Sequence, residues 1–371
     1  MFRKVLVTGG SGFIGSHLTD ALVSNGFEVR ILDNLSPQVH GVAAKRPDYL
    51  NAAAEFIQGD VRSREILRRC LRGVDAVFHL AAAVGVGQSM YEVADYTDVN
   101  AGGTAILMEE LSKSSVEKLI VASSMSIYGE GLYQASDGRI CTCERKIDDL
   151  KNRVWECVNV EGQILAPLPT PESKFPSLPS IYALTKYVQE KTCLMLGAAY
   201  NIPTTALRFF NVYGTRQALS NPYTGVLAIF ASRLLNDRPP LINEDGFQKR
   251  DFVSVRDVVQ ACLLALDKPE ANGKAFNVGS GHAYTIREIA SRVASAVGKP
   301  HIHAEITGKY RVGDIRHCFA DISLISETLG YSPKVHLTEG LVELAGWLEG
   351  QTAIDRFTQA TEELTVRGLS I

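Results

Sequence analysis

The sequence contains no apolar run close to the ~20 residues that a membrane-spanning helix requires. It also lacks a basic excess, because 38 Lys and Arg residues stand against 41 Asp and Glu residues. A general nucleic-acid-binding protein would need such an excess. The basic start of the chain is followed by an apolar segment that glycines interrupt at once, which argues against a signal peptide. We therefore expect a soluble, cytoplasmic protein that binds neither membranes nor nucleic acids.

Cysteine is scarce, since the chain of 371 residues has seven, an odd number spread thinly. This pattern is typical of a reducing compartment and argues against a disulfide framework. Cys141, Cys143 and Cys157 lie in one segment, but a structural zinc site takes four ligands and the segment holds no histidine. The pattern favours plain loop cysteines or a decayed metal knuckle, and we predict no bound metal.

The segment from Lys4 to Asp33 has the pattern of a strand, a glycine turn, a helix and a second strand. Gly9, Gly12 and Gly15 allow a tight turn in which backbone N–H groups approach a pyrophosphate at the start of the helix. Asp33 ends the second strand, where a carboxylate can accept hydrogen bonds from a ribose 2'-hydroxyl and would repel a 2'-phosphate. The agreement of these features predicts a dinucleotide site that prefers NAD to NADP.

Further apolar strand candidates alternate with helices along the first half of the chain. This alternation predicts an α/β fold with a parallel, doubly wound sheet, in which ligands bind at the carboxyl ends of the strands. His79 lies within one apolar strand, which favours a packed core histidine over a catalytic one. The residues at predicted strand ends are Asp60, Val61, Leu80 to Ala82, Asn100 and Ser123 to Ser126.

Tyr182 and Lys186 are four residues apart in a segment of helical pattern, so they share one helix face. The pair alone is a weak signal, because this spacing occurs by chance in many helices. It gains weight from the predicted NAD site and from Ser124 at a strand end. A free tyrosine has a pKa of about 10, and a nearby ammonium together with the positive nicotinamide ring would lower it. The three residues then predict proton transfer coupled to hydride transfer.

The motif "TGGSGFIG" resembles the glycine turn of the extended short-chain dehydrogenase/reductase superfamily. Together with "GDV", "HLAA", "ASSMSIYG" and the Tyr182–Lys186 pair, it resembles the nucleotide-sugar epimerases and dehydratases of that superfamily, from Lys4 to about Glu349. The resemblance implies an NAD-binding Rossmann-type domain over residues 1–205, with an insertion at about 131–179 near the active site. Residues 206–371 would form mainly a smaller mixed α/β substrate-binding domain, with some segments returning to the Rossmann core.

The resemblance also implies roles for individual residues. Ser124, Tyr182 and Lys186 would be catalytic, and NAD would be bound by Gly9, Gly12, Phe13, Ile14, Gly15, Asp33, Asn34, Asp60, Val61, Leu80, Ala81, Ala82, Asn100, Ser123, Tyr182, Lys186 and Phe209. A nucleotide-diphosphate sugar would be bound by Val86, Gly87, Ser89, Ser126, Asn211, Tyr223, Val226, Arg250 and Arg311. Arg250 and Arg311 match the positions that clamp the diphosphate, for which a planar guanidinium is suited. For Arg316, such a contact and an ordinary ion pair both stay open.

Two segments have no chemistry assigned to them. The insertion is expected to form a small excursion over the active-site mouth, followed by an extended arm that contains several prolines. The helices expected from Gly340 to the end of the chain carry apolar stripes, which predict core packing. The family resemblance implies a homodimer.

The residues after Ser124 discriminate among the reactions of the family. The 4,6-dehydratases carry an Asp-Glu pair where this chain has Met125 and Ser126, and the decarboxylases carry a Glu at the position of Ser126. The resemblance therefore implies a 4-epimerase, and "GVGQSM" and "RQALSNPYTGVLAIF" resemble most closely the dTDP-L-rhamnose 4-epimerases, which make dTDP-6-deoxy-L-talose. UDP-glucose or UDP-glucuronate 4-epimerase is the alternative. A net NAD-linked nucleotide-sugar oxidoreductase and a non-catalytic nucleotide-sensing scaffold also stay open.

Overall fold

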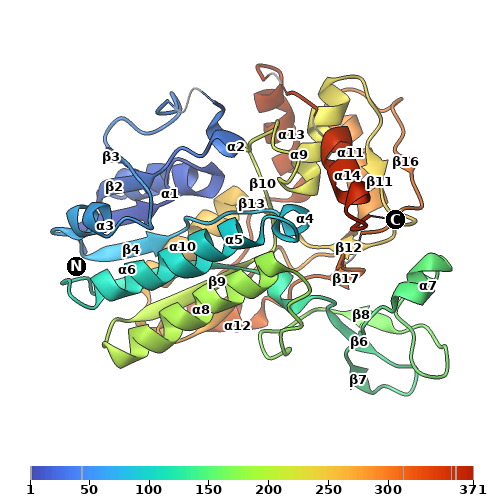
Figure 1. Cartoon of the computed structure of the whole chain (residues 1–371), viewed down its shortest axis with the longest axis horizontal. Helices are drawn as coiled ribbons and strands as arrows, with labels where there is room; N and C mark the ends of the chain where they lie inside the picture. Colours follow the sequence, from blue (N-terminus) through green and yellow to red (C-terminus); the bar gives the residue numbers. More distant parts are fainter. Residues whose placement is uncertain (1, 43–44, 312, 352, 356, 371) are drawn as a thin grey trace.

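A seven-stranded parallel sheet forms the centre of the molecule (Figure 1). The computed structural model describes residues 2–42, 45–311, 313–351, 353–355 and 357–370. The strands follow the order β14-β9-β5-β4-β1-β2-β3, and each neighbouring pair is parallel. Their bounds are β1 Lys4–Thr8, β2 Glu28–Asp33, β3 Glu55–Gln58, β4 Ala76–His79, β5 Lys118–Ser124, β9 Thr204–Phe209 and β14 Ala275–Val278. The predicted Rossmann-type fold is confirmed.

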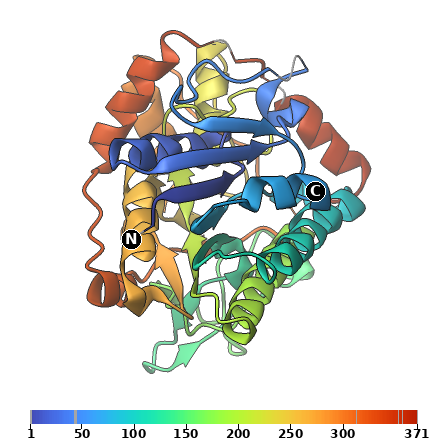
Figure 2. The same ribbon diagram turned by 90° about the vertical axis from the view of Figure 1, so that its left-hand side faces the viewer.

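Side chains of the strands alternate between two hydrophobic clusters, one on each face of the sheet, and Figure 2 shows helices on both sides. On β1, Val5 and Val7 pack with helices α1 and α10, whereas Leu6 packs with helices α3, α6 and α8. A strand buried on both faces needs such an apolar run, because its side chains point to opposite faces in turn. The helix bounds are α1 Phe13–Ser24, α3 Arg64–Leu71, α6 Gly103–Leu111, α8 Ile181–Ala199 and α10 Val255–Asp267.

The second part of the chain builds a smaller unit in which helices α9, α11 and α13 pack around Phe230, Ile289 and Leu344. Short sheets pair β10 with β13, β11 with β16, and β12 with β15 and β17. The chain also returns to the large sheet, because α10 packs on α1 and α12 packs on β14. The bounds are β10 Asn211–Tyr213, α9 Val226–Leu235, β11 Leu241–Ile242, β12 Lys249–Arg250, β13 Phe252–Ser254, β15 Tyr284–Thr285, α11 Ile286–Ala296, β16 Glu305–Ile306, β17 His317–Cys318, α12 Ser323–Leu329 and α13 Leu337–Leu348. The division of the chain after residue 205 stays a prediction.

Shorter elements complete the fold. They are α2 Pro37–His40, α4 Val86–Ser89, α5 Val93–Tyr96, the π-helix η1 Thr97–Gly102, the 3-10 helices η2 Met125–Tyr128 and η3 Pro269–Ala271, and the last helix, α14 Phe357–Val366. Among the residues that the structure describes, no helix combines the length and the apolar character that crossing a membrane would require.

The insertion is a small antiparallel sheet that projects from the body of the molecule (Figure 1). It contains β6 Leu132–Gln134, β7 Ile140–Cys141, α7 Ile147–Lys151 and β8 Ala166–Leu168. Cys143 and Cys157 form a disulfide with their Cα atoms 6.0 Å apart, and Cys141 remains a free thiol. The expectation of plain loop cysteines is therefore wrong for this pair. Cys157 is buried beside Tyr133 and Leu165, and Cys143 packs against the same cluster. Leu165 also donates its N–H to the Cys157 carbonyl at 2.8 Å.

Candidate active site

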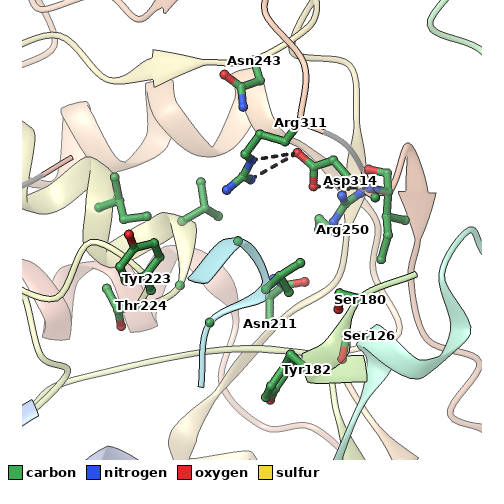
Figure 3. Close-up of a pocket in the computed structure, with 18 of the residues that line it drawn as sticks. Ser126, Ser180, Tyr182, Asn211, Tyr223, Thr224, Asn243, Arg250, Arg311 and Asp314 are labelled. Carbon is green, nitrogen blue, oxygen red and sulfur yellow. Dashed lines mark hydrogen bonds and ion pairs between the residues drawn. The ribbon is translucent and has the colours of Figure 1, made fainter. Parts of the chain in front are cut away.

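A cavity of about 340 Å³ lies between the carboxyl end of β5 and the smaller unit. It is lined by Ser124 and Tyr182 and by eight of the nine predicted substrate-binding residues, namely Val86, Gly87, Ser126, Asn211, Tyr223, Val226, Arg250 and Arg311. Figure 3 shows Tyr182 and Ser126 at one end of this cavity and Arg311 with Asp314 at the other. The ninth predicted residue, Ser89, does not line the cavity, because its fully buried hydroxyl accepts a hydrogen bond from the Tyr182 N–H at 3.0 Å.

Tyr182 lies in the first turn of α8, and the start of this helix is fixed locally. The Ser180 hydroxyl accepts a hydrogen bond from the Ala183 N–H at 3.1 Å, as an N-cap does. The Tyr182 ring meets the Tyr96 ring edge to face, with centroids 6.4 Å apart and ring planes at 90°. Two neighbouring elements therefore orient the phenol before any ligand is considered.

Ser124 ends β5 beside the phenol of Tyr182. Its hydroxyl accepts hydrogen bonds from the Ser126 N–H at 3.2 Å and from the Ser126 hydroxyl at 2.9 Å. Burial raises the pKa of Tyr182, because it disfavours the phenolate, and a hydrogen bond with Ser124 opposes this rise. The expectation that Lys186 and the nicotinamide ring together lower the pKa of Tyr182 concerns the NAD-bound site and stays a prediction.

The Lys186 ammonium is held by hydrogen bonds within the protein. Its Nζ donates to the Ala122 carbonyl at 2.6 Å and to Gln189 Oε1 at 2.5 Å, inside the protein. Burial lowers the pKa of Lys186 to about 8. His79 is fully buried, and burial lowers its pKa to about 3, so the prediction of a packed core histidine is confirmed.

The glycine turn between β1 and α1 has the close approaches that a dinucleotide site needs. Gly9 has a φ of +70°, and a Cβ there would lie 2.8 Å from the Ala81 N atom. A Cβ at Gly15 would overlap the Gly9 carbonyl, so these positions cannot take side chains without displacing the backbone. The Ser11 hydroxyl in this turn is buried and has no hydrogen-bond partner in the described part of the chain. A tight turn at a helix N-terminus with an unpartnered donor fits the pyrophosphate of NAD.

The predicted acidic cofactor residues stand at the ends of β2 and β3. Asp33 accepts hydrogen bonds from the N–H groups of Ser11 at 3.0 Å and Leu35 at 2.9 Å, which leaves carboxylate lone pairs for a ribose. Asp60 accepts a hydrogen bond from Asn34 at 3.0 Å. Hydrogen bonds from Arg62 lower the pKa of Asp60 to about 2, so this carboxylate is ionised at neutral pH.

The remaining predicted cofactor residues belong to the strand ends and to helix α1. Asn100 is fully buried. Its Oδ1 accepts a hydrogen bond from the Ala83 N–H at 2.8 Å and its Nδ2 donates to the Ala83 carbonyl at 3.1 Å, so Asn100 holds the loop after β4. Ser123 donates to the buried Glu190 at 2.7 Å, away from the cavity. Phe13, Ile14, Val61, Leu80, Ala81, Ala82 and Phe209 lie within or next to these elements, and their roles toward NAD stay predictions.

Arg250 and Arg311 line the far end of the cavity together with Asp314. Arg250 Nη1 donates to the Arg316 carbonyl at 2.9 Å, and its Nη2 donates to the Ile315 carbonyl. Arg311 Nη2 donates to the Asp314 carboxylate at 3.1 Å (Figure 3). Burial raises the pKa of Asp314, but Arg311, Arg250 and Arg145 outweigh burial and lower it. The two guanidinium groups therefore stand beside an ionised carboxylate and make a mostly cationic end.

Arg316, which the sequence left open, is a buried ion-pair residue. It pairs with Glu156, with Glu244 at 3.0 Å and with Asp245 at 2.6 Å, and it does not line the cavity. Arg145 completes this charged group by pairing with Glu130 at 3.0 Å and with Glu244 at 2.7 Å.

The positions of the insertion and of the last helix both differ from the prediction. The prediction that the insertion covers the active-site mouth is wrong, because Pro179 is its one residue at the cavity. Its ion pairs instead hold it against Glu244, in the loop between β11 and β12, and against Arg316 and His317 at the start of β17. Helix α13 packs in the core as predicted, but Thr361 and Leu364 of α14 line the cavity.

Comparisons with known proteins agree with this geometry. The model of the NAD dependent epimerase/dehydratase family matches residues 5–143 and 166–279. A dTDP-L-rhamnose 4-epimerase of Burkholderia thailandensis is 35% identical over 352 residues, which cover 93% of this chain and 95% of that relative. A UDP-glucose 4-epimerase of Thermotoga maritima, solved with UDP-glucose, has a TM-score of 0.77 and 32% identity over 94% of this chain and 99% of its own. A UDP-glucuronic acid 4-epimerase of Bacillus cereus, solved with UDP-glucuronic acid and NAD, has a TM-score of 0.74 and 28% identity over 94% and 99%.

Proposed function

Because the chain belongs to the NAD-dependent epimerase/dehydratase family, we propose that it interconverts dTDP-L-rhamnose and dTDP-6-deoxy-L-talose by epimerisation at C4. The coarser identity is that of an NAD-dependent nucleotide-sugar epimerase, an isomerase. One observation carries the proposal: a single cavity joins Tyr182 and Ser126 at one end to Arg250 and Arg311 at the other (Figure 3). Ser124, which is hydrogen-bonded to Ser126, also lines this cavity. In a nucleotide sugar, the reacting carbon C4 and the diphosphate likewise lie on opposite sides of the sugar ring.

Each end of the cavity has a separate task in the proposed reaction. NAD, when bound at the glycine turn, supplies the acceptor and later donor of the C4 hydride. Tyr182 would remove the proton of the C4 hydroxyl and return it, while the Ser124 hydroxyl holds the C4 oxygen. The Ser124 hydrogen bond works against the effect of burial on the pKa of Tyr182 and so favours the phenolate. Arg250 and Arg311 would hold the diphosphate while the 4-keto sugar turns its other face to the cofactor.

The choice of sugar rests on the chemistry of the cavity wall. Its lining includes the apolar side chains Val84, Val86, Met125 and Phe210. In the described part of the chain, the cationic side chains that line it are Arg250 and Arg311, which stand beside Asp314 and not beside Tyr182 (Figure 3). A C6 methyl group suits an apolar wall, whereas a C6 carboxylate near Tyr182 would be desolvated without a cationic partner. This favours a 6-deoxy sugar over a glucuronate, and UDP-glucose is the second candidate because of the 32% identity to the Thermotoga maritima enzyme.

The test is to incubate the purified chain separately with dTDP-L-rhamnose, UDP-glucose and UDP-glucuronate, with no NAD added. NMR should detect a C4 epimer of dTDP-L-rhamnose, because the hydride returns to the sugar and the cofactor is not consumed. Tyr182→Phe should lower this rate by about 10² to 10⁴-fold, as loss of a general base does. Epimerisation of UDP-glucose alone would replace the proposed substrate. NADH production only when NAD is supplied would contradict the epimerase and indicate a net oxidoreductase.

A further inference from the structure

The end of the chain is anchored before it reaches the active site. After α13, Asn236 Nδ2 donates to the Ala353 carbonyl at 2.9 Å, and the Ile354 N–H donates to the Ser220 hydroxyl at 3.0 Å. The Asp355 carboxylate pairs with Arg233 at 3.1 Å. These contacts tie residues 353–355 to α9 and the loop before it, so α14 begins from a fixed point.

Helix α14 then lies next to α4 (Figure 1). Thr361, Leu364 and Ser370 line the same cavity as Tyr182. Leu364 is buried, and a Cβ added at Gly87 would come within 3.3 Å of its Cδ1 atom. The absence of a side chain at Gly87 therefore leaves the room that Leu364 occupies.

A carboxylate and two phenols attach α14 to the segment that follows α4 and to the loop before α9. Glu363 accepts hydrogen bonds from Tyr91 Oη at 2.9 Å and from Tyr223 Oη at 3.1 Å, and the two phenol oxygens are 2.5 Å apart. The Arg367 guanidinium lies 4.3 Å from the centre of the Tyr91 ring. Tyr91 follows α4 and Tyr223 precedes α9, so the clasp formed by Tyr91, Tyr223 and Glu363 joins three segments that are distant in sequence.

The last residues reach the opposite end of the cavity. Ser370 pairs through the backbone with Arg311 in an isolated antiparallel bridge. The segment thus runs from Tyr223 to one of the two arginines proposed to hold the diphosphate. Among the side chains of α14 that the structure describes, Leu364 is the buried apolar one, and it belongs to none of the hydrophobic clusters of the fold. A segment that is not part of the main hydrophobic core can open at a lower free-energy cost than the core itself.

We propose that residues 357–370 form a movable wall of the nucleotide-sugar site, and that Glu363 positions Tyr223 toward the bound substrate. This inference rests on the proposed function. The wall would close over a nucleoside-diphosphate sugar and open when the clasp releases, to let the product leave. It would contribute to binding and not to the chemical step, because the proton-transfer residues are on β5 and α8.

The test uses dTDP and UDP as probes in titration calorimetry, with hydrogen exchange of residues 357–370 followed in the same samples. The variants are Glu363→Gln, Leu364→Ala and a chain that ends at Asp355, which keeps the anchoring contacts to α9. Glu362→Gln is the matched control, because Glu362 is the exposed neighbour of Glu363. Thermal unfolding of each variant checks that the fold is retained.

We expect a bound nucleotide to protect residues 357–370 from exchange in the unmodified chain. Glu363→Gln and Leu364→Ala should weaken nucleotide binding about tenfold, which equals ~1.4 kcal/mol, and should raise KM for the sugar nucleotide while kcat stays within about twofold. Glu362→Gln should leave both values unchanged. If the unmodified chain binds dTDP or UDP and the shortened chain binds it equally well, the wall proposal is wrong. If the unmodified chain binds neither nucleotide, the proposed function is wrong, and the substrate role of this segment with it.

Discussion

Lys186 Nζ donates a 2.5 Å hydrogen bond to Gln189 Oε1, and Gln189 Nε2 donates in turn to His79 Nε2 at 2.9 Å. The acceptor role of His79 agrees with the strong lowering of its pKa by burial. The other ring nitrogen of His79 lies 2.8 Å from the Thr8 hydroxyl at the end of β1. A chain of buried side chains therefore fixes the Lys186 ammonium relative to the central sheet.

Gln189→Leu should lower kcat about 10- to 100-fold with little change in KM, because a charge-assisted hydrogen bond of this kind stabilises by about 1.5–3 kcal/mol. Steady-state kinetics with the sugar nucleotide that the chain epimerises would measure the effect. Gln163→Leu, at an exposed position of the insertion, is the control. An unchanged kcat in Gln189→Leu would mean that Lys186 holds its position without this partner.

Lys186 should also affect stability in a pH-dependent way. Its pKa is about 8 in the folded chain and 10.5 in an unperturbed lysine, so the unfolded chain binds more protons between these values. The lysine therefore destabilises the fold by about 3 kcal/mol below pH 8, and this penalty disappears as the pH rises through the window to 10.5. Lys186→Met should therefore have a higher unfolding free energy than the unmodified chain, and this difference should be largest at pH 7 and smallest near pH 10. Urea unfolding at both pH values measures it, and an equal difference at the two would contradict the assignment.

Arg145 should act on substrate binding from outside the cavity. Its Nη2 donates to the Asp314 carbonyl at 2.6 Å, and the Asp314 side chain pairs with Arg311. Arg145→Met would remove the ion pair of the buried Glu130 and leave Glu244 with Arg316 alone, and breaking such a buried pair costs about 3–5 kcal/mol. We expect lower stability and a KM raised about tenfold in the folded protein, from the ~1.4 kcal/mol that a displaced clamp would lose. Arg139→Met, at an exposed position of the insertion, should change neither value, and a normal KM in Arg145→Met would contradict the positioning role.

The disulfide of the insertion should be detectable and stabilising. Peptide mapping without reductant should find Cys143 linked to Cys157. The two residues are 14 apart in sequence, and loss of a link of that loop length costs about 3 kcal/mol in the chain-entropy model. Cys143→Ser should therefore reduce the unfolding free energy, whereas Cys141→Ser, which changes a free thiol, should have a small effect. Equal stabilities of the two variants under oxidising conditions would contradict the pairing.

The homodimer stays a prediction, and α8 offers a surface for it. Leu184, Val188 and Met195 lie along one face of this helix with exposed fractions of 42%, 37% and 64%. An exposed apolar stripe of this kind is typical of an interface between two copies of a chain. Analytical ultracentrifugation should show a dimer that Met195→Glu converts to a monomer. Val160→Glu, at a surface position of the insertion, should leave the dimer intact, and a monomeric unmodified chain would rule out this interface.

The parts of the molecule that sequence predicted well are those encoded within short segments. The glycine turn is predicted from its own segment, because the φ of +70° at Gly9 and the close approach of Gly15 to the Gly9 carbonyl are local requirements. Tyr182 and Lys186 share a helix face through their spacing alone. The Rossmann-type sheet followed from apolar runs that are buried on both faces.

The parts that sequence missed depend on contacts between distant segments. Ser89 was assigned to the substrate, yet its hydroxyl is used by the Tyr182 N–H, 93 residues away. The sequence around Gln189 predicts a helix but no role for this residue, and its partner His79 lies 110 residues away. The clasp joins Tyr91 to Glu363 across 272 residues. No local pattern contains such pairings, and the burial that raises the pKa of Tyr182 is equally absent from any local pattern.

Arg250 has five N–H donors, and its contacts with the backbone decide which of them a ligand can use. Both donors on Nη1 are engaged, by the carbonyls of Lys249 and Arg316, and Nη2 gives one donor to Ile315. Within the described part of the chain, this leaves the edge formed by Nε and the second Nη2 donor. A phosphate would therefore meet this guanidinium from the side and not head-on. β12 pairs with β15 on one side and with β17 on the other, which fixes the backbone of Arg250, and the carbonyl contacts fix its guanidinium group. Little side-chain entropy therefore remains to be lost when an anion binds.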